Sequence, residues 1–378
     1  MALSPPRFSL GIEEEYFLVS LESRDLIRER PQALMDQLQA KIGKHVTAEF
    51  LQAQIEIGTP VCDTVQGARQ ALADLRGQVI ETAHAFGCAP IAASTHPFAQ
   101  WRDTQHTADD RYDTLAHDLQ AVVQRMMTCG MHVHVGIEND ELRIDLMNQA
   151  RYFLPHLLSL STSSPFWAGR DTGLKSYRLA VMNEMPRTGL PDQFVSWGEY
   201  SRTIDVLVEN NVIEDASKVW WDLRPSSKFP TLEMRITDVC TKLDDAVALA
   251  GLFVGICRML YRLRQGNQRW RSYPLVLLNE NRWRAKRYGL EGSLFDLGQA
   301  RLVETRKLID ELVELTLDAS DGDETLSAAL RACRALAQGE TSAERQRNAF
   351  QVALKAGQDQ QAALQAVVDH LITETAAF

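Results

Sequence analysis

Three consecutive glutamates, Glu13, Glu14 and Glu15, stand in a run of alternating apolar and polar residues near the start of the sequence. If residues 8 to 19 form a β-strand, successive side chains point to opposite faces, so Glu13 and Glu15 share one face and Glu14 joins the apolar residues on the other. Two carboxylates about 7 Å apart on one strand face suit a shared divalent cation. A solvated edge strand would carry the same glutamates, so this run alone leaves both interpretations open.

A second alternating run, residues 52 to 57, places Glu56 opposite an apolar face that carries two isoleucines. Glu49 has the wrong parity to share the face of Glu56. It joins that face only if a bulge or turn at residues 50 and 51 shifts the register, because one inserted residue reverses the facing of the side chains beyond it. The pattern therefore predicts Glu56 on the polar face and makes the position of Glu49 depend on such a turn.

Two histidines, His132 and His134, occupy alternate positions in a third run, residues 131 to 137, which is bracketed by glycines. Their side chains share a face, and a methionine and two valines share the other. A His-x-His pair on a strand commonly binds a metal ion. Two hydrogen-bonded histidines inside a sheet would show the same pattern.

The fourth run, residues 231 to 239, again alternates and places Glu233 and Arg235 on one face. An ion pair within the strand, of small energetic value, would explain this pair taken singly. The repetition of polar, ionisable faces across four runs favours a common site.

If the four runs lie in one sheet, its polar face gathers several carboxylates that repel one another unless cations neutralise them. The side chains on that face are Glu13, Glu15, Glu56, His132, His134, Glu233 and Arg235. Mg²⁺, or Mn²⁺, is the hard cation that such oxygen ligands suit, and it leaves room for phosphate oxygens. The sequence has no Walker A motif and no convincing dinucleotide-binding glycine pattern, so any ATP must be held through metals and arginines.

Five arginines are candidates for forked contacts to phosphate or carboxylate groups. They are Arg178, Arg224, Arg258, Arg282 and Arg284. A structural or surface role is the plainer explanation for each one taken singly.

Helical patterns must position these runs. Apolar residues at intervals of three and four predict helices on the apolar face of the sheet at residues 64 to 86, 114 to 128 and 141 to 160. Beyond residue 243 the chain reads almost entirely as helix, at 243 to 264, 300 to 317, 324 to 337 and 342 to 375. The turn-rich segment 161 to 191 is predicted to be a lid or a substrate loop.

The sequence therefore predicts an α+β protein with a helical C-terminal part. We expect a single catalytic domain over residues 1 to 378, with a sheet-bearing core at about 8 to 290 and the helical part at about 291 to 378.

Composition excludes several classes of protein. The 378 residues are 45% hydrophobic, with no apolar run of 18 or more and no signal-peptide pattern at the start, which favours a cytoplasmic protein without a membrane partner. Six scattered cysteines, with no Cys-x-x-Cys pair, predict packing residues and no disulfide framework or zinc site. A formal net charge of −10 disfavours nucleic acid as a partner.

The order and spacing of six motifs resemble the glutamate–cysteine ligase type 2 family, the YbdK-like carboxylate–amine ligases. The motifs are GIEEE, EFLQAQIEIGTP, STHPF, GMHVHVG, WDLRPS and TLEMRITD, spread over roughly residues 8 to 290. The resemblance implies the glutamine synthetase/guanidino kinase type of catalytic fold. In that fold an open, curved antiparallel sheet is covered by helices on one face and holds Mg²⁺ and ATP on the other.

The resemblance also implies roles for particular residues. The expected metal ligands are Glu13, Glu15, Glu49, Glu56, His132 and Glu233. Arg235 is expected to touch the transferring phosphoryl group, with Glu13 and Glu233 as catalytic residues beside it and Arg224 as a second nucleotide contact. His134 and Glu14 are not carried over from the family pattern, and their roles stay open.

The implied reaction joins the γ-carboxylate of glutamate to an amine, such as that of cysteine, through γ-glutamyl phosphate. The resemblance further implies small-molecule substrates and a homodimer. The sequence does not identify the amine, nor whether glutamate is the true carboxylate donor. Two alternatives stay open: a Zn²⁺- or Mn²⁺-dependent hydrolase that uses the His-x-His and glutamate cluster, and a non-catalytic, nucleotide-binding member of the family.

Overall fold

An antiparallel sheet forms the centre of the protein. The computed structural model describes residues 5–108, 117 and 119–378. Within these residues the main sheet has seven strands in the order β10-β11-β5-β1-β3-β2, with β4 also paired to β1. The strands are β1 (Leu10–Ser20), β2 (Val46–Ala48), β3 (Gln54–Gly58), β4 (Cys88–Ile91), β5 (Met131–Gly136), β10 (Leu223–Pro225) and β11 (Thr231–Met234).

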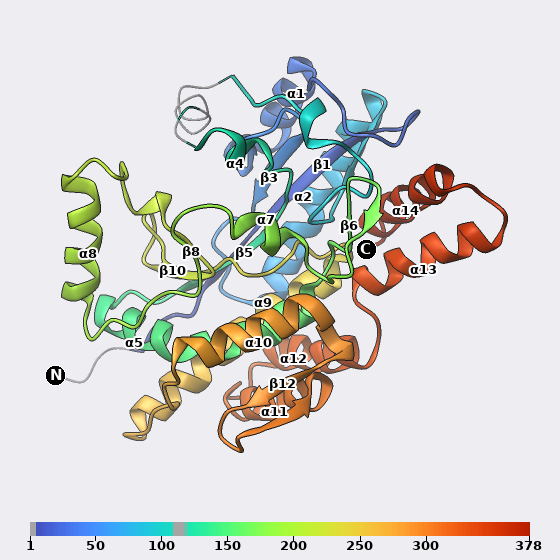
Figure 1. Ribbon diagram of the computed structural model, residues 1–378. Helices are drawn as coiled ribbons and strands as arrows, with labels where there is room; N and C mark the ends of the chain where they lie inside the picture. Colours follow the sequence, from blue (N-terminus) through green and yellow to red (C-terminus); the bar gives the residue numbers. More distant parts are fainter. Residues whose placement is uncertain (1–4, 109–116, 118) are drawn as a thin grey trace.

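Strand β1 is the long central strand of this sheet (Figure 1). One of its edges pairs with β5 and then with β4, and its other edge pairs with β3. The four predicted strands are confirmed, although β11 ends at Met234 and β3 begins only at Gln54. Strands β2, β4 and β10 were not predicted, because three or four residues are too few to show a period-2 pattern.

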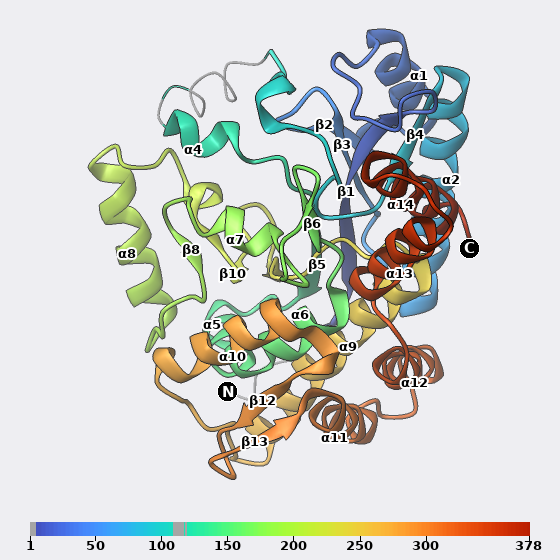
Figure 2. The same cartoon turned by 45° about the vertical axis from the view of Figure 1, so that its right-hand side comes forward.

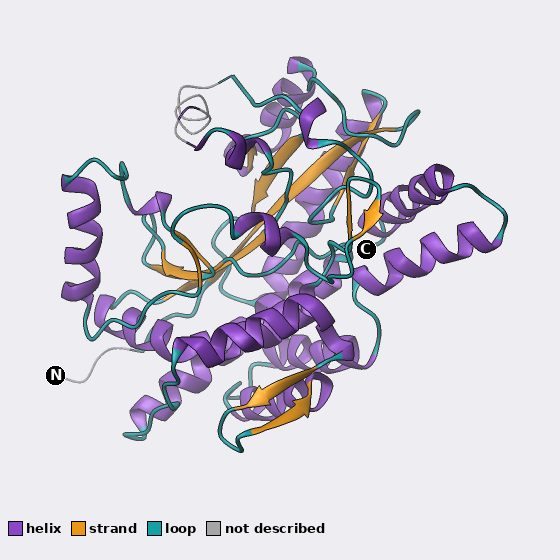
Figure 3. Cartoon of the chain, viewed as in Figure 1, coloured by secondary structure: helices purple, strands orange, loops and turns teal. Residues whose placement is uncertain are grey.

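Helices surround the sheet, as Figure 3 shows. They are α1 (Gln32–Ile42), α2 (Val65–Ala85), α4 (Ala121–Gln124), α5 (Asp140–Ala150), α6 (Leu154–Ser161), α7 (Arg178–Met182), α8 (Trp197–Glu209), α9 (Leu243–Gln265), α10 (Leu275–Tyr288), α11 (Thr305–Asp318), α12 (Glu324–Gln338), α13 (Ser342–Lys355) and α14 (Gln360–Thr375). Several begin at a side-chain cap that accepts a backbone N–H, such as Thr64 before α2 and Asn139 before α5.

Helices α2 and α9 cover the apolar face of the sheet. Both pack on β1, and α9 also packs on β5. Figure 2 shows them on one side of β1, with the short helix α7 on the other. Helix α9 is long and apolar enough to cross a membrane by length and composition, but 78% of the apolar window is buried inside the protein. Its apolar surface is therefore part of the hydrophobic core. All six cysteines are free thiols buried in that core.

The structure differs from the predicted helices in three ways. The predicted helix at 300 to 317 begins with a strand, because β13 (Arg301–Glu304) pairs with β12 (Ser293–Asp296) before α11 starts. The predicted helix at 342 to 375 is two helices, α13 and α14, separated by a turn in which Gly357 has φ +88°. Helices α1, α8 and α10 were not predicted.

The predicted helix at 114 to 128 is described only at its C-terminal end. Residues 109–116 and 118 lie outside the described part, and helix α4 is limited to Ala121–Gln124. The predicted helix at 141 to 160 is confirmed as α5 and α6, joined by a single 3₁₀ turn.

The segment predicted as a lid or substrate loop, residues 161 to 191, is largely buried. It contains α7 and three short strands, β6 (Phe166–Trp167), β7 (Arg170–Asp171) and β8 (Thr188–Gly189), the last of which pairs with β9 (Trp220–Trp221). The buried carboxylate of Asp238 accepts hydrogen bonds from the backbone N–H of Ser163 and the hydroxyls of Ser164 and Ser176. This network fixes the segment against the sheet.

Glu14, whose role the sequence left open, lies on the apolar face of β1 and is fully buried. Its carboxylate oxygens accept hydrogen bonds from Nε and Nη2 of Arg76 in α2, at 2.8 and 2.7 Å. The same guanidinium donates to the carbonyl oxygens of Cys240 and Thr241, and the Tyr16 hydroxyl donates to Glu14. Glu14 therefore joins the sheet to α2 and to the start of α9.

Removal of one partner from this buried ion pair should strongly destabilise the fold, because an unpaired charge would remain in the core. For Arg76→Ala we expect the free energy of unfolding to fall by about 3 to 5 kcal/mol. The matched control is Arg69→Ala in the same helix, whose pair with Asp244 is exposed and should contribute at most about 1 kcal/mol. Urea unfolding followed by circular dichroism measures both, and equal losses would contradict a structural role for the Glu14–Arg76 pair.

Candidate active site

A cavity of about 340 Å³ lies over the polar face of the sheet. Every residue expected to bind metal or nucleotide lines it: Glu13, Glu15, Glu49, Glu56, His132, Arg224, Glu233 and Arg235. His134 and Arg178 line it as well. The sheet register explains the convergence, since Glu13 pairs with His132, Glu15 with Glu56, and Glu233 with His134 on adjacent strands.

Glu15, Glu49 and Glu56 form the first candidate metal group. One carboxylate oxygen from each lies within 4.8 Å of the other two. Burial and the charge of Glu49 raise the pKa of Glu15 to about 7, and burial with the same neighbour raises the pKa of Glu56 well above its usual value. Glu49 reaches this group because β2 ends at Ala48 and a turn separates it from β3, which is the register change that the sequence required.

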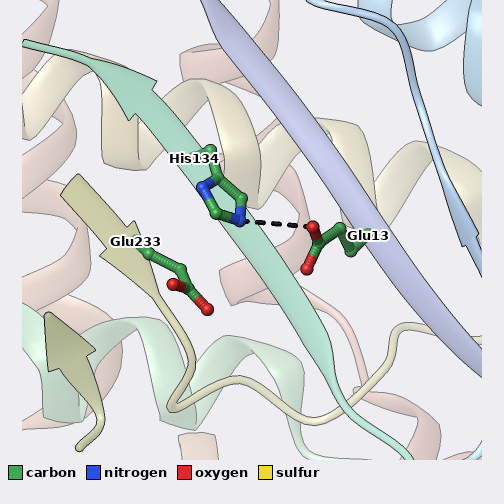
Figure 4. Close-up of side chains that lie close together, drawn as sticks. All are labelled: Glu13, His134 and Glu233. Atoms are coloured by element: carbon green, nitrogen blue, oxygen red, sulfur yellow. Dashed lines mark ion pairs between the residues drawn. The ribbon is translucent and has the colours of Figure 1, made fainter. Parts of the chain in front are cut away.

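Glu13, His134 and Glu233 form the second candidate group, drawn in Figure 4. Ligand atoms from these three residues, on β1, β5 and β11, also lie within 4.8 Å of one another. Nε2 of His134 is 3.4 Å from Oε1 of Glu13, and its Nδ1 is 2.9 Å from the hydroxyl of Thr231, which fixes the ring orientation. His134, which the family resemblance did not carry over, therefore has the geometry of a ligand.

His132 lies between the two groups. Its Nδ1 is 3.3 Å from Oε2 of Glu13 and 3.4 Å from Nη1 of Arg235, and its Nε2 is 3.9 Å from Oε1 of Glu15. Burial and the charge of Arg235 lower the pKa of His132 to about 4, so the ring is neutral near pH 7. A neutral imidazole is the form that binds metal.

Two arginines hold Glu233 from opposite sides. Arg224 donates from Nε and Nη2 to the carboxylate at 2.9 and 3.1 Å, and Arg235 donates to it from Nη1. Burial alone would raise the pKa of Glu233, but these two guanidinium groups hold it well below its usual range. Nη1 of Arg224 also donates to the carbonyl oxygens of Ser217 and Val219, so all three of its nitrogens are engaged.

Arg178 is a buried arginine in the wall of the cavity. Within the described residues its side-chain hydrogen bonds go only to the carbonyl oxygens of Arg235, Ile236 and Thr237, at 3.2 to 3.4 Å. The guanidinium packs directly over Gly130, where any β-carbon would lie 2.5 Å from Nη2. A larger residue at position 130 would therefore displace the guanidinium of Arg178 from this position.

The other arginine candidates lie away from the catalytic cavity. Arg258 pairs with Asp323, and Arg282 donates a forked pair of hydrogen bonds to Asp222. Arg284 donates to the carbonyl oxygen of Ser293. None of these three lines the cavity over the sheet.

The residues present fit divalent cations. Three crowded carboxylates in one group and a mixed carboxylate–imidazole set in the other offer mainly hard oxygen donors. The Nε2 atoms of His132 and His134 are buried and have no hydrogen-bond partner within the described residues. Unpaired imidazole nitrogens close to carboxylates, that of His132 near Glu15 and that of His134 near Glu13, fit a site for a divalent cation.

The fold is shared with solved ligases. The glutamate–cysteine ligase of Francisella tularensis, solved in complex with AMP, matches 98% of this chain and 89% of its own with a TM-score of 0.69 and 12% identity. A bifunctional glutathione synthetase from Pasteurella multocida matches 97% of this chain and 52% of its own with a TM-score of 0.68 and 15% identity. The predicted glutamine synthetase/guanidino kinase-like class, with an open antiparallel sheet, is confirmed.

Sequence comparison identifies the family. Residues 9–370 match the family model of glutamate-cysteine ligase family 2 (GCS2). Relatives named "Putative glutamate--cysteine ligase 2" include one from Rhodospirillum rubrum, 56% identical over 98% of this chain and 96% of its own length, and one from Jannaschia sp., 52% identical over 98% and 97%. The chain is thus an enzyme of the carbon–nitrogen ligase class, and it belongs to glutamate-cysteine ligase family 2.

Loss of one carboxylate from the first group should weaken cation binding. For Glu56→Gln, which keeps the shape and removes the charge, we expect Mn²⁺ affinity to fall about tenfold or more. Electron paramagnetic resonance of free Mn²⁺ measures the binding. Glu22→Gln, an exposed glutamate just beyond β1, is the control and should bind as the wild type. Unchanged affinity in Glu56→Gln would show that this group does not hold the cation.

Proposed function

We propose that this enzyme is an ATP-dependent carboxylate–amine ligase that joins the γ-carboxylate of glutamate to an amine. The observation that carries the proposal is the convergence of two candidate metal groups and Arg235 in one cavity over the sheet. The family match and the AMP complex of the Francisella tularensis ligase support a nucleotide in such a site.

The carboxylates and imidazoles divide the cavity into two cation-binding parts. Glu15, Glu49 and Glu56 would hold one Mg²⁺ or Mn²⁺, and Glu13, Glu233 and an imidazole would hold another. His134 is the imidazole in the second group, with His132 close to Glu13 and Arg235. Bound cations of this kind neutralise phosphoryl oxygens and orient them for in-line displacement.

Arg235 and Arg224 have different hydrogen-bond partners, which indicates different roles. Only Nη1 of Arg235 makes hydrogen bonds within the described residues, so its Nε and Nη2 remain available to the transferring phosphoryl group. Arg224 has less capacity, because four of its five N–H groups already donate to Glu233 or to a carbonyl oxygen, and only one N–H, on Nη2, is left. Both arginines were expected to contact the nucleotide. We now assign that contact mainly to Arg235, and we propose that Arg224 orients the carboxylate of Glu233.

The proposed chemistry has two steps. The γ-carboxylate attacks the terminal phosphorus of ATP and ADP leaves, while Arg235 stabilises charge on the phosphoryl oxygens. The amine nitrogen then bonds to the carbonyl carbon of γ-glutamyl phosphate, the carbon–oxygen bond to phosphate breaks, and the proton of the nitrogen passes to the leaving phosphate. The products are ADP, phosphate and a γ-glutamyl amide.

Several wider features belong to the same proposal. We propose one catalytic domain, a homodimer and a cytoplasmic location. One cluster of buried apolar side chains, which includes residues from β1 and from α14, supports the single domain. The amine and the identity of the carboxylate donor are what the first assay must establish.

Phosphate release from ATP tests the reaction. With Mg²⁺, glutamate and a panel of amines that includes cysteine, we expect release that requires both glutamate and one class of amine. Glu13→Ala and Arg235→Ala should each lower turnover by about a hundredfold or more, because the first removes a ligand of the cation and the second a guanidinium that stabilises the transferring phosphoryl group. Arg235→Lys, which keeps the charge and loses the planar fork, should retain part of the activity.

The same assay separates the alternatives. Full activity in both alanine variants would reject the assigned site. Metal-dependent hydrolysis that needs no ATP would favour the hydrolase interpretation of the His-x-His pair. Measurable ATP binding without release on any amine would favour a non-catalytic member or another carboxylate donor.

A further inference from the structure

A second cavity, of about 500 Å³, lies beside the catalytic cavity. Its walls are the first turn of α5, one face of α8 and the turn at residues 226 to 230 that joins β10 to β11. Figure 1 shows α8 standing apart from the sheet on the side of β10. The assignments made above leave this cavity without a role.

One turn separates the two cavities. Ser226, Ser227, Lys228 and Phe229 line both of them. The Phe229 side chain is 55% exposed at this shared wall, and its ring meets that of His134 edge-on at 6.1 Å between centroids. A ligand in the second cavity therefore lies next to the metal-binding face, with only this short turn between them.

The lining of the second cavity is acidic. It carries four carboxylates, Glu138, Asp140, Asp205 and Asp215, against two basic side chains, Arg143 and Lys228. The guanidinium of Arg143 already donates to Asp140 at 2.9 Å and to the carbonyl oxygen of Ile137. This excess of carboxylates favours a cation over an anion as the ligand.

Aromatic rings provide a second, independent feature. Trp197 and Tyr200 of α8 lie with ring centroids 5.1 Å apart in the cavity wall, and the guanidinium carbon of Arg143 lies 5.5 Å from the centroid of the Trp197 ring. Tyr200 is only 5% exposed, yet its hydroxyl makes no hydrogen bond within the described residues. Of the two nearby guanidinium groups, that of Arg143 pairs with Asp140, and that of Arg224 shares the carboxylate of Glu233 with Arg235. The hydroxyl oxygen can therefore accept a hydrogen bond from an ammonium group.

We propose that this second cavity binds the distal ammonium group of the amine acceptor, and that the acceptor class is a short aliphatic diamine. The carboxylates and the hydroxyl of Tyr200 would hold one ammonium group, while the carbon chain passes Phe229 and presents the other amino group to the catalytic cavity. This inference rests on the proposed ligase function and adds to it the chemical class of the acceptor.

The test compares two amines of equal chain length, 1,4-diaminobutane and butylamine, as acceptors in the phosphate-release assay with ATP, glutamate and Mg²⁺. We expect the kcat/KM for the diamine to exceed that for the monoamine by about fivefold or more, the size of one cation–aromatic or ion-pair contact. Asp205→Asn and Tyr200→Phe should each lower this ratio toward one. Asp36→Asn, an exposed aspartate on the distant helix α1, should leave it as in the wild type.

A binding measurement avoids dependence on turnover. Calorimetric titration of the ATP-free enzyme with 1,4-diaminobutane should show binding that Asp205→Asn weakens and Asp36→Asn does not. If the kcat/KM values for the diamine and the monoamine are equal, or if their ratio is unchanged in both Asp205→Asn and Tyr200→Phe, the inference is overturned. Turnover of cysteine without that preference overturns it while the proposed function stands, whereas no phosphate release with any amine overturns the proposed function itself.

Discussion

The crowding of three carboxylates on one sheet face is the constraint on which the rest of the structure depends. Carboxylate oxygens of the half-buried Glu15, Glu49 and Glu56 lie within 4.8 Å of one another, and the raised pKa values of Glu15 and Glu56 express the cost of keeping them charged together. Backbone pairing of β1, β3 and β2 holds them there whatever their charge. The apolar core behind the sheet stabilises that pairing, so the acidic cluster exists because the fold imposes it.

Strand β1 carries glutamates on both faces, and the groups that surround them differ between the two faces. Toward the core, Glu14 is neutralised by a protein cation, Arg76, and becomes a structural element. Toward the cavity, Glu13 and Glu15 face histidines and other carboxylates, and within the described residues no arginine or lysine lies in ion-pair contact with either. The alternation of side chains along β1 thus separates two kinds of charge. Glu14 is neutralised by an arginine of the protein, whereas Glu13 and Glu15 are placed where a bound cation would neutralise them.

The division between chemistry and selectivity follows from the same architecture. Short strands with fixed register position the candidate metal-binding groups and Arg235. This arrangement would suit the activation of any carboxylate by phosphoryl transfer. The wall beyond Phe229 is built from α8 and from the turn between β10 and β11, elements whose side chains can change without moving the sheet. In the proposed enzyme, the acceptor would thus be selected at the edge of the sheet, and the carboxylate would be activated at its centre.

Much of the site could be predicted from the sequence because strand alternation is a local property. Glu13, Glu15, Glu56, His132 and Glu233 all face the cavity as their parity requires. Strand parity alone could not place Glu49, which was assigned only through the family resemblance. It also could not show that Arg224 pairs with Glu233, that Arg178 packs over Gly130, or that Arg76 meets Glu14. These are contacts between residues far apart in the chain, and the periodicity of one segment carries no information about the partner that another segment brings to it. The sequence by itself determined which side chains share a face, and only the tertiary structure decided which of those faces meet.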